Sequence, residues 1–574
     1  MTNNKNRVVA DVMRILSFLI LLIPGLAFGQ LTQNLFIDTK AMSLGNAVTA
    51  DPVGLMSIHF NPAGLTKLDG RQIQISFMNI VLGAEAEFSL PDHYEPGEAG
   101  LLRIHEDNVL PRECGKLEKD ANGKYINCSA SSKSTAAAYL PGVGIMPMHL
   151  PVLTLPSGGL SIQPAGSKFT FANAAYAPMA AGFAKEDDDP GRYQAKQVAL
   201  QRFTYLSPSF GYKVSDTFSV GAAFLFSHQA VAVKQNVRAP SVLIGVLGEL
   251  QNAFGCFDED GNATGNDPLA PIVTLCGGRI GPYEEVGELT IMTEESLSPS
   301  FNLGLLWEPT DWFALGVGYQ SAANAHLKGT YELNYSDDFS NFFAHFRASI
   351  VGAIASTMFS LPTGQKQEAG NISTELTYPQ HLQIGTKFRL LDRLQLNVDA
   401  GWTDFDQWDS LTFEFDRHVN FLSAAKTTSP EIITDTSLSM PMNYESVWSW
   451  GFGLAYDLNS RTQLRLGYEP RETSVPKDAR SVQAPLGFAT MYSVGVGYQW
   501  DLDTVIDFSL SFMQSKEDIW ADHQSDSNNY EFPNSSDAIN RNCLTCSVTS
   551  PYPGLDVSTK LTIGALGFTF RTKF

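Results

Sequence analysis

The stretch from Met491 to Trp500, MYSVGVGYQW, decides the fold class of this chain. Large apolar side chains alternate with small or polar ones, so one face of an extended strand carries Tyr492, Val494, Val496, Tyr498 and Trp500. A strand in a soluble sandwich seldom has rings at both ends of its apolar face, whereas a strand that crosses a bilayer has apolar residues outward and rings at both interfaces. The stretch therefore predicts a strand of a membrane β-barrel.

The same alternation recurs at 313–320, 506–512 and 566–574. Marking every such stretch predicts strands at 71–88, 134–155, 168–183, 198–214, 217–237, 286–308, 311–334, 371–390, 393–415, 444–458, 461–473, 487–501, 503–517 and 557–574. Tight turns alternate with long insertions between them, as in outer-membrane barrels. Because lipid offers no partner to an open sheet edge, the predicted fold is all-β: a closed 14-stranded antiparallel transmembrane β-barrel over residues 71–574.

The N-terminus has the layout of a secretory signal peptide over residues 1–29. Basic residues precede an apolar run from Ile15 to Ile23, and the small-residue site Ala27-Phe28-Gly29 follows. A retained anchor helix is the alternative, but the run is shorter than the roughly 18 apolar residues that a membrane span needs. Removal of the segment would leave Gln30 first and place the chain outside the cytoplasm.

The composition excludes some partners. The formal net charge is −21, which makes nucleic acid an improbable ligand. Charged residues make up only 17% of the chain, as expected for strands that show lipid on one side. The acids cluster in predicted loops, where they are either solvated or bridged by divalent cations. No cofactor site and no metal site is predicted.

The six cysteines all lie outside the alternating strands, as three pairs of near neighbours: Cys114 and Cys128, Cys256 and Cys276, and Cys543 and Cys546. An exported chain meets an oxidising compartment, so three local loop disulfides are expected. The Cys543-x-x-Cys546 spacing is also found in redox and zinc sites, but no second such pair and no nearby histidine completes one here.

Two long insertions are apolar at helical spacing. The first, 241–254, carries Val242, Leu243, Val246, Leu247, Leu250 and Phe254, and the second, 339–361, includes Phe343, Phe346 and Ile350. In one interpretation the two helices pack on each other as a loop core. In the other they frame an exposed groove, which a protein at an aqueous surface would keep to capture a hydrophobic molecule.

The segment before the first strand resembles a known family. It contains Ser43-Leu44-Gly45-Asn46-Ala47, Ala50-Asp51-Pro52 and Asn61-Pro62-Ala63-Gly64-Leu65. This block is similar to the N-terminal plug, or hatch, of the outer-membrane long-chain fatty acid transporter (FadL-like) family, whose signature includes Asn-Pro-Ala before the first strand. With the signal peptide, the strands, the apolar loops and the terminal aromatic residue, the resemblance covers nearly the whole chain. It implies a barrel plugged by residues 30–70, with Asn61, Pro62, Ala63 and Gly64 as the hatch motif.

The resemblance also implies a route for a substrate. The molecule would land in the outer-loop groove, move to an internal pocket beside the hatch, and leave sideways through a gap at a kinked third strand. In this chain Asn173, Pro178 and Gly182 are the irregular residues of that strand, because proline removes a ladder donor and glycine permits a bulge. The alternative is that Pro178 only marks the end of the strand.

An acid headgroup would need a cationic partner. The candidates are Lys234 and Arg238 near the outer end of the fifth strand and Arg347 in the second loop helix, each of which is otherwise an ordinary rim charge.

The leading hypothesis is passive uptake of a hydrophobic compound, with fatty acid favoured over an aromatic hydrocarbon or an alkane. The alternatives are a surface adhesin or general porin, and an outer-membrane hydrolase. No Gly-x-Ser-x-Gly motif is present and His228 has no evident nucleophile, so the chain is not expected to be an enzyme. A monomer is expected, in contact with outer-membrane lipid and lipopolysaccharide and inserted by the barrel-assembly machinery through its C-terminal strand.

Overall fold

The structure is a computed structural model that describes residues 34–95, 103–148, 152–238, 240, 242–258, 261–358, 361–426, 433–476, 487–521, 552 and 554–574. The predicted signal peptide, 1–29, lies outside the described residues, as do Cys543 and Cys546.

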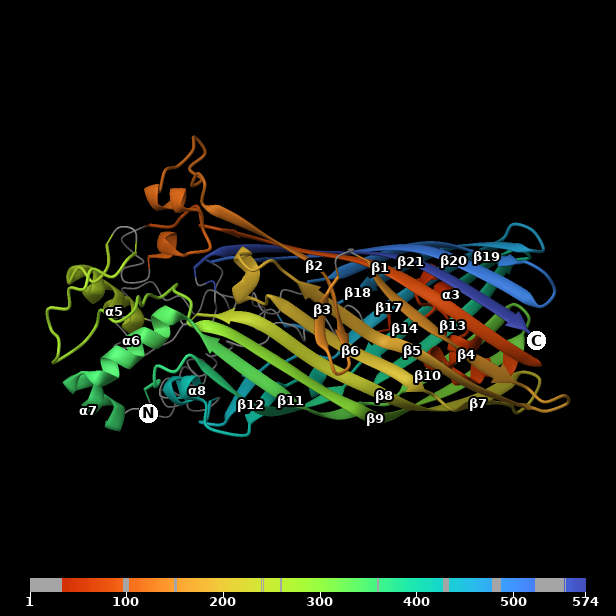
Figure 1. The fold of residues 1–574 in the computed structure, drawn as a ribbon. Helices are drawn as coiled ribbons and strands as arrows, with labels where there is room; N and C mark the ends of the chain where they lie inside the picture. Colours follow the sequence, from red (N-terminus) through yellow and green to blue (C-terminus); the bar gives the residue numbers. More distant parts are fainter. Residues whose placement is uncertain are drawn as a thin grey trace, which may run out of the picture.

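The described strands form one antiparallel sheet that closes on itself (Figure 1). The closing pair joins the first and last strands along their whole length, from Gln72 opposite Lys573 to Ser89 opposite Asp556. The wall has fourteen strands, as the sequence predicts. The β1–β21 pairing closes the ladder and removes the free edge that an open sheet would expose to lipid.

The strands are β1 (Arg71–Ser89), β2 (Ser129–Leu140), β3 (Gly144–Pro147), β4 (Leu153–Ile162), β5 (Phe169–Ala184), β6 (Gln197–Leu206), β7 (Ser209–Lys213), β8 (Phe218–Val237), β9 (Gly287–Thr310), β10 (Phe313–Gln320), β11 (Ala323–Tyr335), β12 (Gln367–Tyr378), β13 (His381–Leu391), β14 (Leu394–Thr403), β15 (Ser410–Phe415), β16 (Ser437–Pro441), β17 (Val447–Asp457), β18 (Thr462–Arg471), β19 (Ala489–Gln499), β20 (Thr504–Ile519) and β21 (Asp556–Lys573). The pairs β2/β4, β6/β7, β10/β11, β12/β13, β14/β15 and β16/β17 each make one wall strand in two parts, and β3 pairs only with β2.

The α-helices are α3 (Thr39–Ser43), α4 (Ser57–Phe60), α5 (Val242–Ala253), α6 (Asp337–Ala348), α7 (Ile350–Met358) and α8 (Asn420–Ala425). The 3-10 helices are η1 (Gly54–Met56), η2 (Pro62–Lys67), η3 (Ile104–Glu106), η4 (Arg112–Lys116), η5 (Pro190–Tyr193) and η6 (Phe405–Gln407). Among the described helices, none has both the length and the apolar composition that a bilayer crossing requires.

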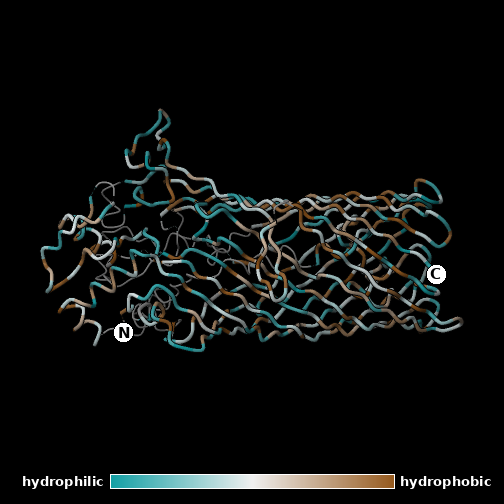
Figure 2. Tube along the Cα trace, viewed as in Figure 1, coloured by the Kyte–Doolittle hydropathy of each residue, from teal (hydrophilic) through white to brown (hydrophobic). Residues whose placement is uncertain are grey.

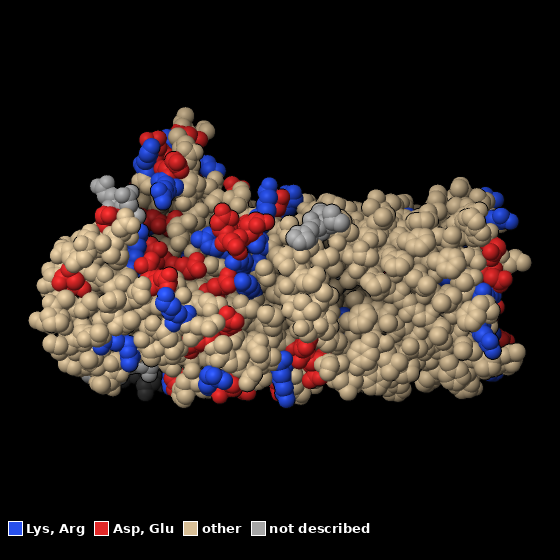
Figure 3. All heavy atoms as spheres, viewed as in Figure 1, with Lys and Arg blue, Asp and Glu red and all other residues tan. Residues whose placement is uncertain are grey.

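The side chains of β19 face the predicted sides of the wall. Tyr492 and Val494 are 59% and 47% exposed on the outer face, whereas Met491 and Ser493 are 0% and 5% exposed on the inner face. Apolar residues recur along the barrel end that carries the short turns (Figure 2), and the visible face of this end has few charges except at its rim (Figure 3). This apolar belt is the part of the wall that faces lipid.

In the tight turns, side-chain oxygens accept hydrogen bonds from backbone amides. In the β17–β18 turn Asn459 Oδ1 accepts hydrogen bonds from the amides of Arg461 and Thr462, both at 2.9 Å. In the β19–β20 turn Asp501 Oδ1 accepts from Asp503 and Thr504, at 2.9 and 2.8 Å. Short Asx turns of this kind let neighbouring strands return at once.

Residues 34–68 fill the lumen at the same end of the barrel. Almost all of their side chains are buried, and the Asp38 carboxylate caps α3 by accepting from the amides of Lys40 and Ala41. The hatch backbone approaches the wall so closely that a Cβ at Gly316 would collide with the Thr49 carbonyl, and one at Gly304 with Asn61 and Pro62. Small inward residues in the wall therefore make room for the hatch.

Two predictions about continuity were wrong. The second wall strand is not continuous over 134–155, because Pro141 and Gly142 turn the chain back into the β2–β3 hairpin. The apolar stretch 339–361 forms two helices rather than one. Ser349 accepts from the Gly352 amide and donates to the Phe346 carbonyl, so it ends α6 and begins α7.

We predict that Gly316→Val displaces the hatch, because the added carbons would occupy the position of the Thr49 carbonyl. In planar-bilayer recordings the variant should conduct more ions than the native protein. Alternatively, its heat-modifiable gel mobility should show that a smaller fraction of the protein folds into the barrel. Gly564→Val is the matched control, since nothing lies within 4 Å of a Cβ at that outward position. A folded Gly316→Val protein with native conductance would contradict this account of the lumen.

Candidate functional site

The hatch motif anchors the lumen-filling segment to the wall. Asn61 Oδ1 accepts from the Ala63 amide at 3.1 Å and so caps η2, which Pro62 begins. The Asn61 Nδ2 group donates to the carbonyls of Thr49 at 2.7 Å and Leu305 of β9 at 2.9 Å. One side chain therefore joins two parts of the hatch to the barrel.

The third wall strand, β5, is bulged at Pro178. Its register with β6 shifts between Tyr176 and Met179, and the partner strand is interrupted nearby, between β6 and β7, opposite residues 173–175. Asn173 Oδ1 accepts from the Ser207 amide at 2.8 Å, inside this interruption. Gly182 pairs with Ala199 of β6 and lies against the Ala137 carbonyl of β2. The three predicted residues therefore span the irregular part of β5.

The second wall strand leaves the sheet beside this bulge. On that side of β5, β2 pairs with residues 183–184 and β4 with residues 171–175, so residues 176–182 have no ladder partner among the described residues. In β1 the pairing passes from β4 at Ile80 to β2 at Ala84, which leaves residues 81–83 without a described partner on the same side. The wall thus has an interruption framed by β1 and β5.

The chain that leaves the wall forms a hairpin on its outer surface. Tyr139 of β2 and Ile145 of β3 pack on the outward residues Ala199, Ala230 and Ala232 of β6 and β8. The Tyr139 hydroxyl donates to Glu294 of β9 at 2.9 Å, and its ring stacks on His228. His228 Nε2 lies 3.1 Å from the same carboxylate. The hairpin therefore packs on the outer surface of the wall, next to the interruption.

The interior beside the interruption is apolar. One continuous cluster of buried side chains joins the hatch, the inner faces of β1 and β5, and the outer-loop helices; it includes Leu35, Phe36, Met78, Ile80, Leu82, Met179, Ala181, Phe339 and Phe342. A hydrophobic molecule that entered among these residues would meet apolar surface from the outer loops down to the hatch.

A polar network of the hatch touches the bulge. The Asn34 amide donates to the Pro178 carbonyl at 3.3 Å. The Asn34 side chain bonds Gln320 at 3.3 Å and His59 Nε2 at 2.8 Å, and His59 Nδ1 lies 3.4 Å from the hydroxyl of Tyr176. Asn34 and His59 therefore supply partners to backbone and side chains of the irregular strand from inside the barrel.

Arg202 is a buried cation at the level of the bulge, where it pairs with Met179 across the β5–β6 ladder. Its side chain is inward and only 5% of the residue is exposed. The guanidinium donates to Ser300 at 2.7 Å and Ser227 at 3.4 Å and lies 4.5 Å above the Tyr378 ring. Among the described residues it has no carboxylate partner, whereas the buried Arg238, Arg465 and Arg471 each have one.

Arg202 is not among the headgroup candidates predicted from the sequence. The signal was present, because the alternation of Val198, Leu200, Arg202 and Thr204 places the arginine on the inward face of a wall strand. The spacing does not show whether an inward charge has an acidic neighbour from a distant strand.

The predicted headgroup candidates all have partners in the structure. Lys234 is 2.7 Å from Glu288, and Arg347 donates to the Leu361 carbonyl at 3.0 Å. Arg238 is completely buried against Asp107 at 2.8 Å and stacks on the rings of Tyr193 and Tyr552. Arg238 therefore ties outer loops together. The binding of an acid headgroup by Lys234, Arg238 or Arg347 remains a prediction.

Lys185, a half-buried cation, lies nearer the outer end of the interruption. Lys185 lines a small hollow together with Ala84, Phe183 and Leu561. Burial lowers the pKa of the Lys185 ammonium to about 8, against the opposing effect of Asp189. The group donates to the Gly191 carbonyl and to Gln194.

The two predicted loop helices are present but do not simply pack on each other. In α5, Ile244 and Leu247 pack against the apolar cluster, as do Phe343 and Phe346 of α6. The segment 275–281 lies against both helices: Gln251 of α5 donates to the Leu275 and Gly278 carbonyls, and Gly277 and Gly278 contact α6. In α7, Ile350 and Ile354 are both 57% exposed. The loops combine a packed base with an exposed apolar tip.

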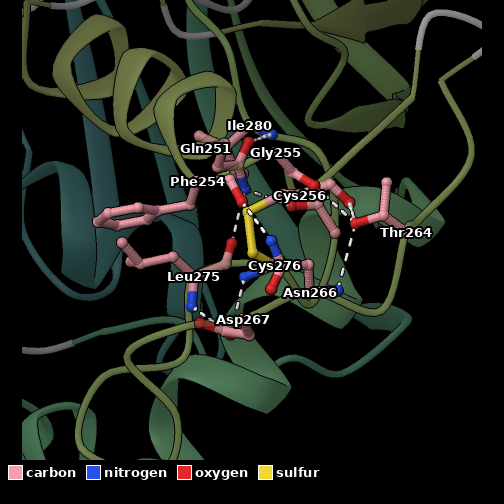
Figure 4. The surroundings of a disulfide bond; sticks show 11 residues. Gln251, Phe254, Gly255, Cys256, Thr264, Asn266, Asp267, Leu275, Cys276 and Ile280 are labelled. Carbon is pink, nitrogen blue, oxygen red and sulfur yellow. Dashed lines mark hydrogen bonds between the residues drawn. A yellow bond between two sulfur atoms is a disulfide. The ribbon is translucent and has the colours of Figure 1, made fainter.

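Two disulfides hold the outer loops, joining Cys114 to Cys128 and Cys256 to Cys276. Figure 4 shows the second, with Asp267 accepting from the amides of Leu275 and Cys276 and Gln251 reaching the same segment. This bridge fixes the segment that separates α5 from α6.

Fold and site together define a plugged outer-membrane β-barrel with an apolar interior. The model of the family described as "Outer membrane protein transport protein (OMPP1/FadL/TodX)" matches residues 25–549, and the chain belongs to this family. The long-chain fatty acid transport protein of Escherichia coli is 22% identical over 217 residues, which are 38% of this chain and 42% of that protein.

Solved structures show the same fold. A Pseudomonas aeruginosa FadL homologue has a TM-score of 0.61 at 17% identity, covering 95% of this chain and 99% of that one. The Pseudomonas putida toluene transporter TodX has a TM-score of 0.53 at 13% identity, covering 94% and 99%. The chain spans about half the length of the curated relatives it matches.

We predict that Tyr139→Ala loosens the β2–β3 hairpin, because it removes both the hydrogen bond to Glu294 and the ring stack on His228. Amides of 144–147 should exchange with deuterium about tenfold faster, which corresponds to ~1.4 kcal/mol. Tyr139→Phe keeps the ring and should have a smaller effect, and β20 serves as the internal reference. Unchanged exchange in the hairpin would mean that other contacts hold it.

Proposed function

We propose that this protein carries long-chain fatty acids passively across the outer membrane. The observation that supports this substrate class best is Arg202, a buried guanidinium that bonds only to hydroxyl groups among the described residues. A buried charge without a counter-ion is costly, and a carboxylate that entered beside it would form charge-assisted hydrogen bonds. Arg202 would therefore select an acid headgroup.

Apolar parts of the protein would bind the acyl tail of the substrate. Each buried methylene contributes about 0.8 kcal/mol, so a long acyl chain gains strongly by leaving water for apolar surface. The exposed residues of α7 would receive the molecule, and the apolar cluster between the loops and the hatch would hold the tail. Burial of the tail provides this free energy without an external energy source.

Exit would be lateral, through the wall interruption between β1 and β5. The unpaired backbone of this region would be costly in lipid, but Asn34 supplies a donor to Pro178 from inside and the β2–β3 hairpin covers the outside. A tail that leaves sideways enters the bilayer without returning to water. Asn173, Pro178 and Gly182 would then serve to keep the third wall strand irregular.

The second candidate function is uptake of an aromatic hydrocarbon. The likeness in fold to the toluene transporter of Pseudomonas putida favours it, and such a substrate needs no cation in the lumen. The two candidates therefore differ in whether Arg202 contributes to uptake.

We predict that Arg202→Gln lowers oleate uptake by about tenfold, the effect of losing ~1.4 kcal/mol of headgroup binding. Toluene uptake should change less than about twofold, because that molecule has no carboxylate for the lost charge to bind. The assay uses a strain that lacks its own transporters and expresses each variant at equal outer-membrane levels.

Arg202→Lys is the matched control, since it keeps the charge and should retain most of the oleate uptake. Equal oleate uptake by native protein and Arg202→Gln would remove the support for an acid substrate. A loss of both activities would assign Arg202 a structural role.

A further inference from the structure

Three lysines form a row across neighbouring wall strands. Lys516 of β20 pairs directly with Lys560 of β21, which pairs with Glu85 of β1, which pairs with Lys133 of β2. All four side chains are outward, because their neighbours Ser515, Thr559, Ala86 and Ser132 are buried on the inner face. The register therefore places Lys516 beside Lys560, and Lys133 on the far side of Glu85, all on the outer surface of the barrel.

The row lies just outside the apolar belt. On the same outward face, Phe512 is the last large apolar residue of β20 and is 48% exposed. The four residues from Phe512 to Lys516 rise about 10 Å along the barrel axis, at ~3.4 Å per residue and a strand tilt of roughly 40°. This is the level at which the charged headgroups of the outer leaflet begin.

Within the described part of the chain, the three lysines have no counter-ion at ion-pair distance. Like charges directly opposite each other on a strand pair are destabilising. Glu85 shares the row, and Glu87 and Asp518 lie two residues further out, where Asp518 accepts from the Ser558 hydroxyl at 2.6 Å. Among the described residues none of these carboxylates lies within ion-pair distance of Lys516, Lys560 or Lys133.

In another part of the wall a lysine lies opposite an acid. On β9 and β11 the outward Lys328 pairs in register with Glu294, and His326 Nδ1 of β11 is 3.0 Å from Glu375 of β12. The direct opposition of two lysines, Lys516 and Lys560, is therefore a feature of the β20–β21 pair.

We propose that Lys516, Lys560 and Lys133 bind the phosphates of a phosphorylated glycolipid of the outer leaflet, the lipid A part of lipopolysaccharide. Phosphate oxygens accept charge-assisted hydrogen bonds from ammonium groups. The acyl chains of the same molecule would lie along the exposed apolar residues directly below, including Phe512, Leu566 and Val81. A phosphate at the row would relieve the repulsion between Lys516 and Lys560 and fix the depth of the barrel in the membrane.

The test uses the full-length protein in nanodiscs of zwitterionic phospholipid, with binding of diphosphoryl lipid A measured by native mass spectrometry. The triple variant Lys133→Gln, Lys516→Gln, Lys560→Gln should bind at least about tenfold more weakly than the native protein. Lys328→Gln is the matched control, because this lysine faces Glu294, and it should change binding less than about twofold.

Two further probes identify the chemistry. Dephosphorylated lipid A and phosphatidylglycerol should each bind the native protein about tenfold more weakly than diphosphoryl lipid A does. Equal binding by the triple variant, or equal binding of either probe, would overturn the proposal.

Heat-modifiable mobility checks the fold. If the triple variant fails to fold, Glu85→Gln gives an independent test: removal of the carboxylate between Lys560 and Lys133 should tighten binding about twofold or more, and unchanged or weaker binding would overturn the proposal.

Discussion

The structure depends on one constraint: every backbone amide and carbonyl that faces hydrocarbon must have a hydrogen-bond partner within the protein. A closed ladder from β1 to β21 meets this constraint nearly everywhere. The constraint also explains the alternation of side chains, because a wall one strand thick must show lipid on one face and the lumen on the other. Strand count, closure and side-chain polarity are therefore consequences of the same solvent.

The place where the ladder is broken is the informative one. Between β1 and β5 the second wall strand leaves the sheet, and β5 bulges at Pro178. The protein compensates from two sides, with Asn34 of the hatch inside and the β2–β3 hairpin outside. A break that is supported from both sides is a feature of the fold, and the lateral passage that we propose would give it a physical purpose.

The hatch and the wall are fitted to each other. Inward positions such as Gly304 and Gly316 have no side chain because backbone of the hatch occupies that space. Asn61 uses its amide to hold both Thr49 and Leu305. Since the same lumen also contains Arg202 and the lower part of the apolar cluster, the plug, the apolar cluster and the wall interruption are parts of one packed interior.

The sequence by itself determined the barrel, its fourteen strands and the hatch motif, because a period of two residues and an Asn-Pro turn are local properties of the chain. Only the tertiary structure decided which charges have partners. Arg238 meets Asp107 across 131 residues, whereas the hydrogen-bond partners of Arg202 among the described residues are hydroxyls, and nothing in the spacing of either arginine separates the two cases. Periodicity could not predict the β2–β3 hairpin either, because its strands alternate like wall strands. Only the sheet register shows that the hairpin lies outside the wall.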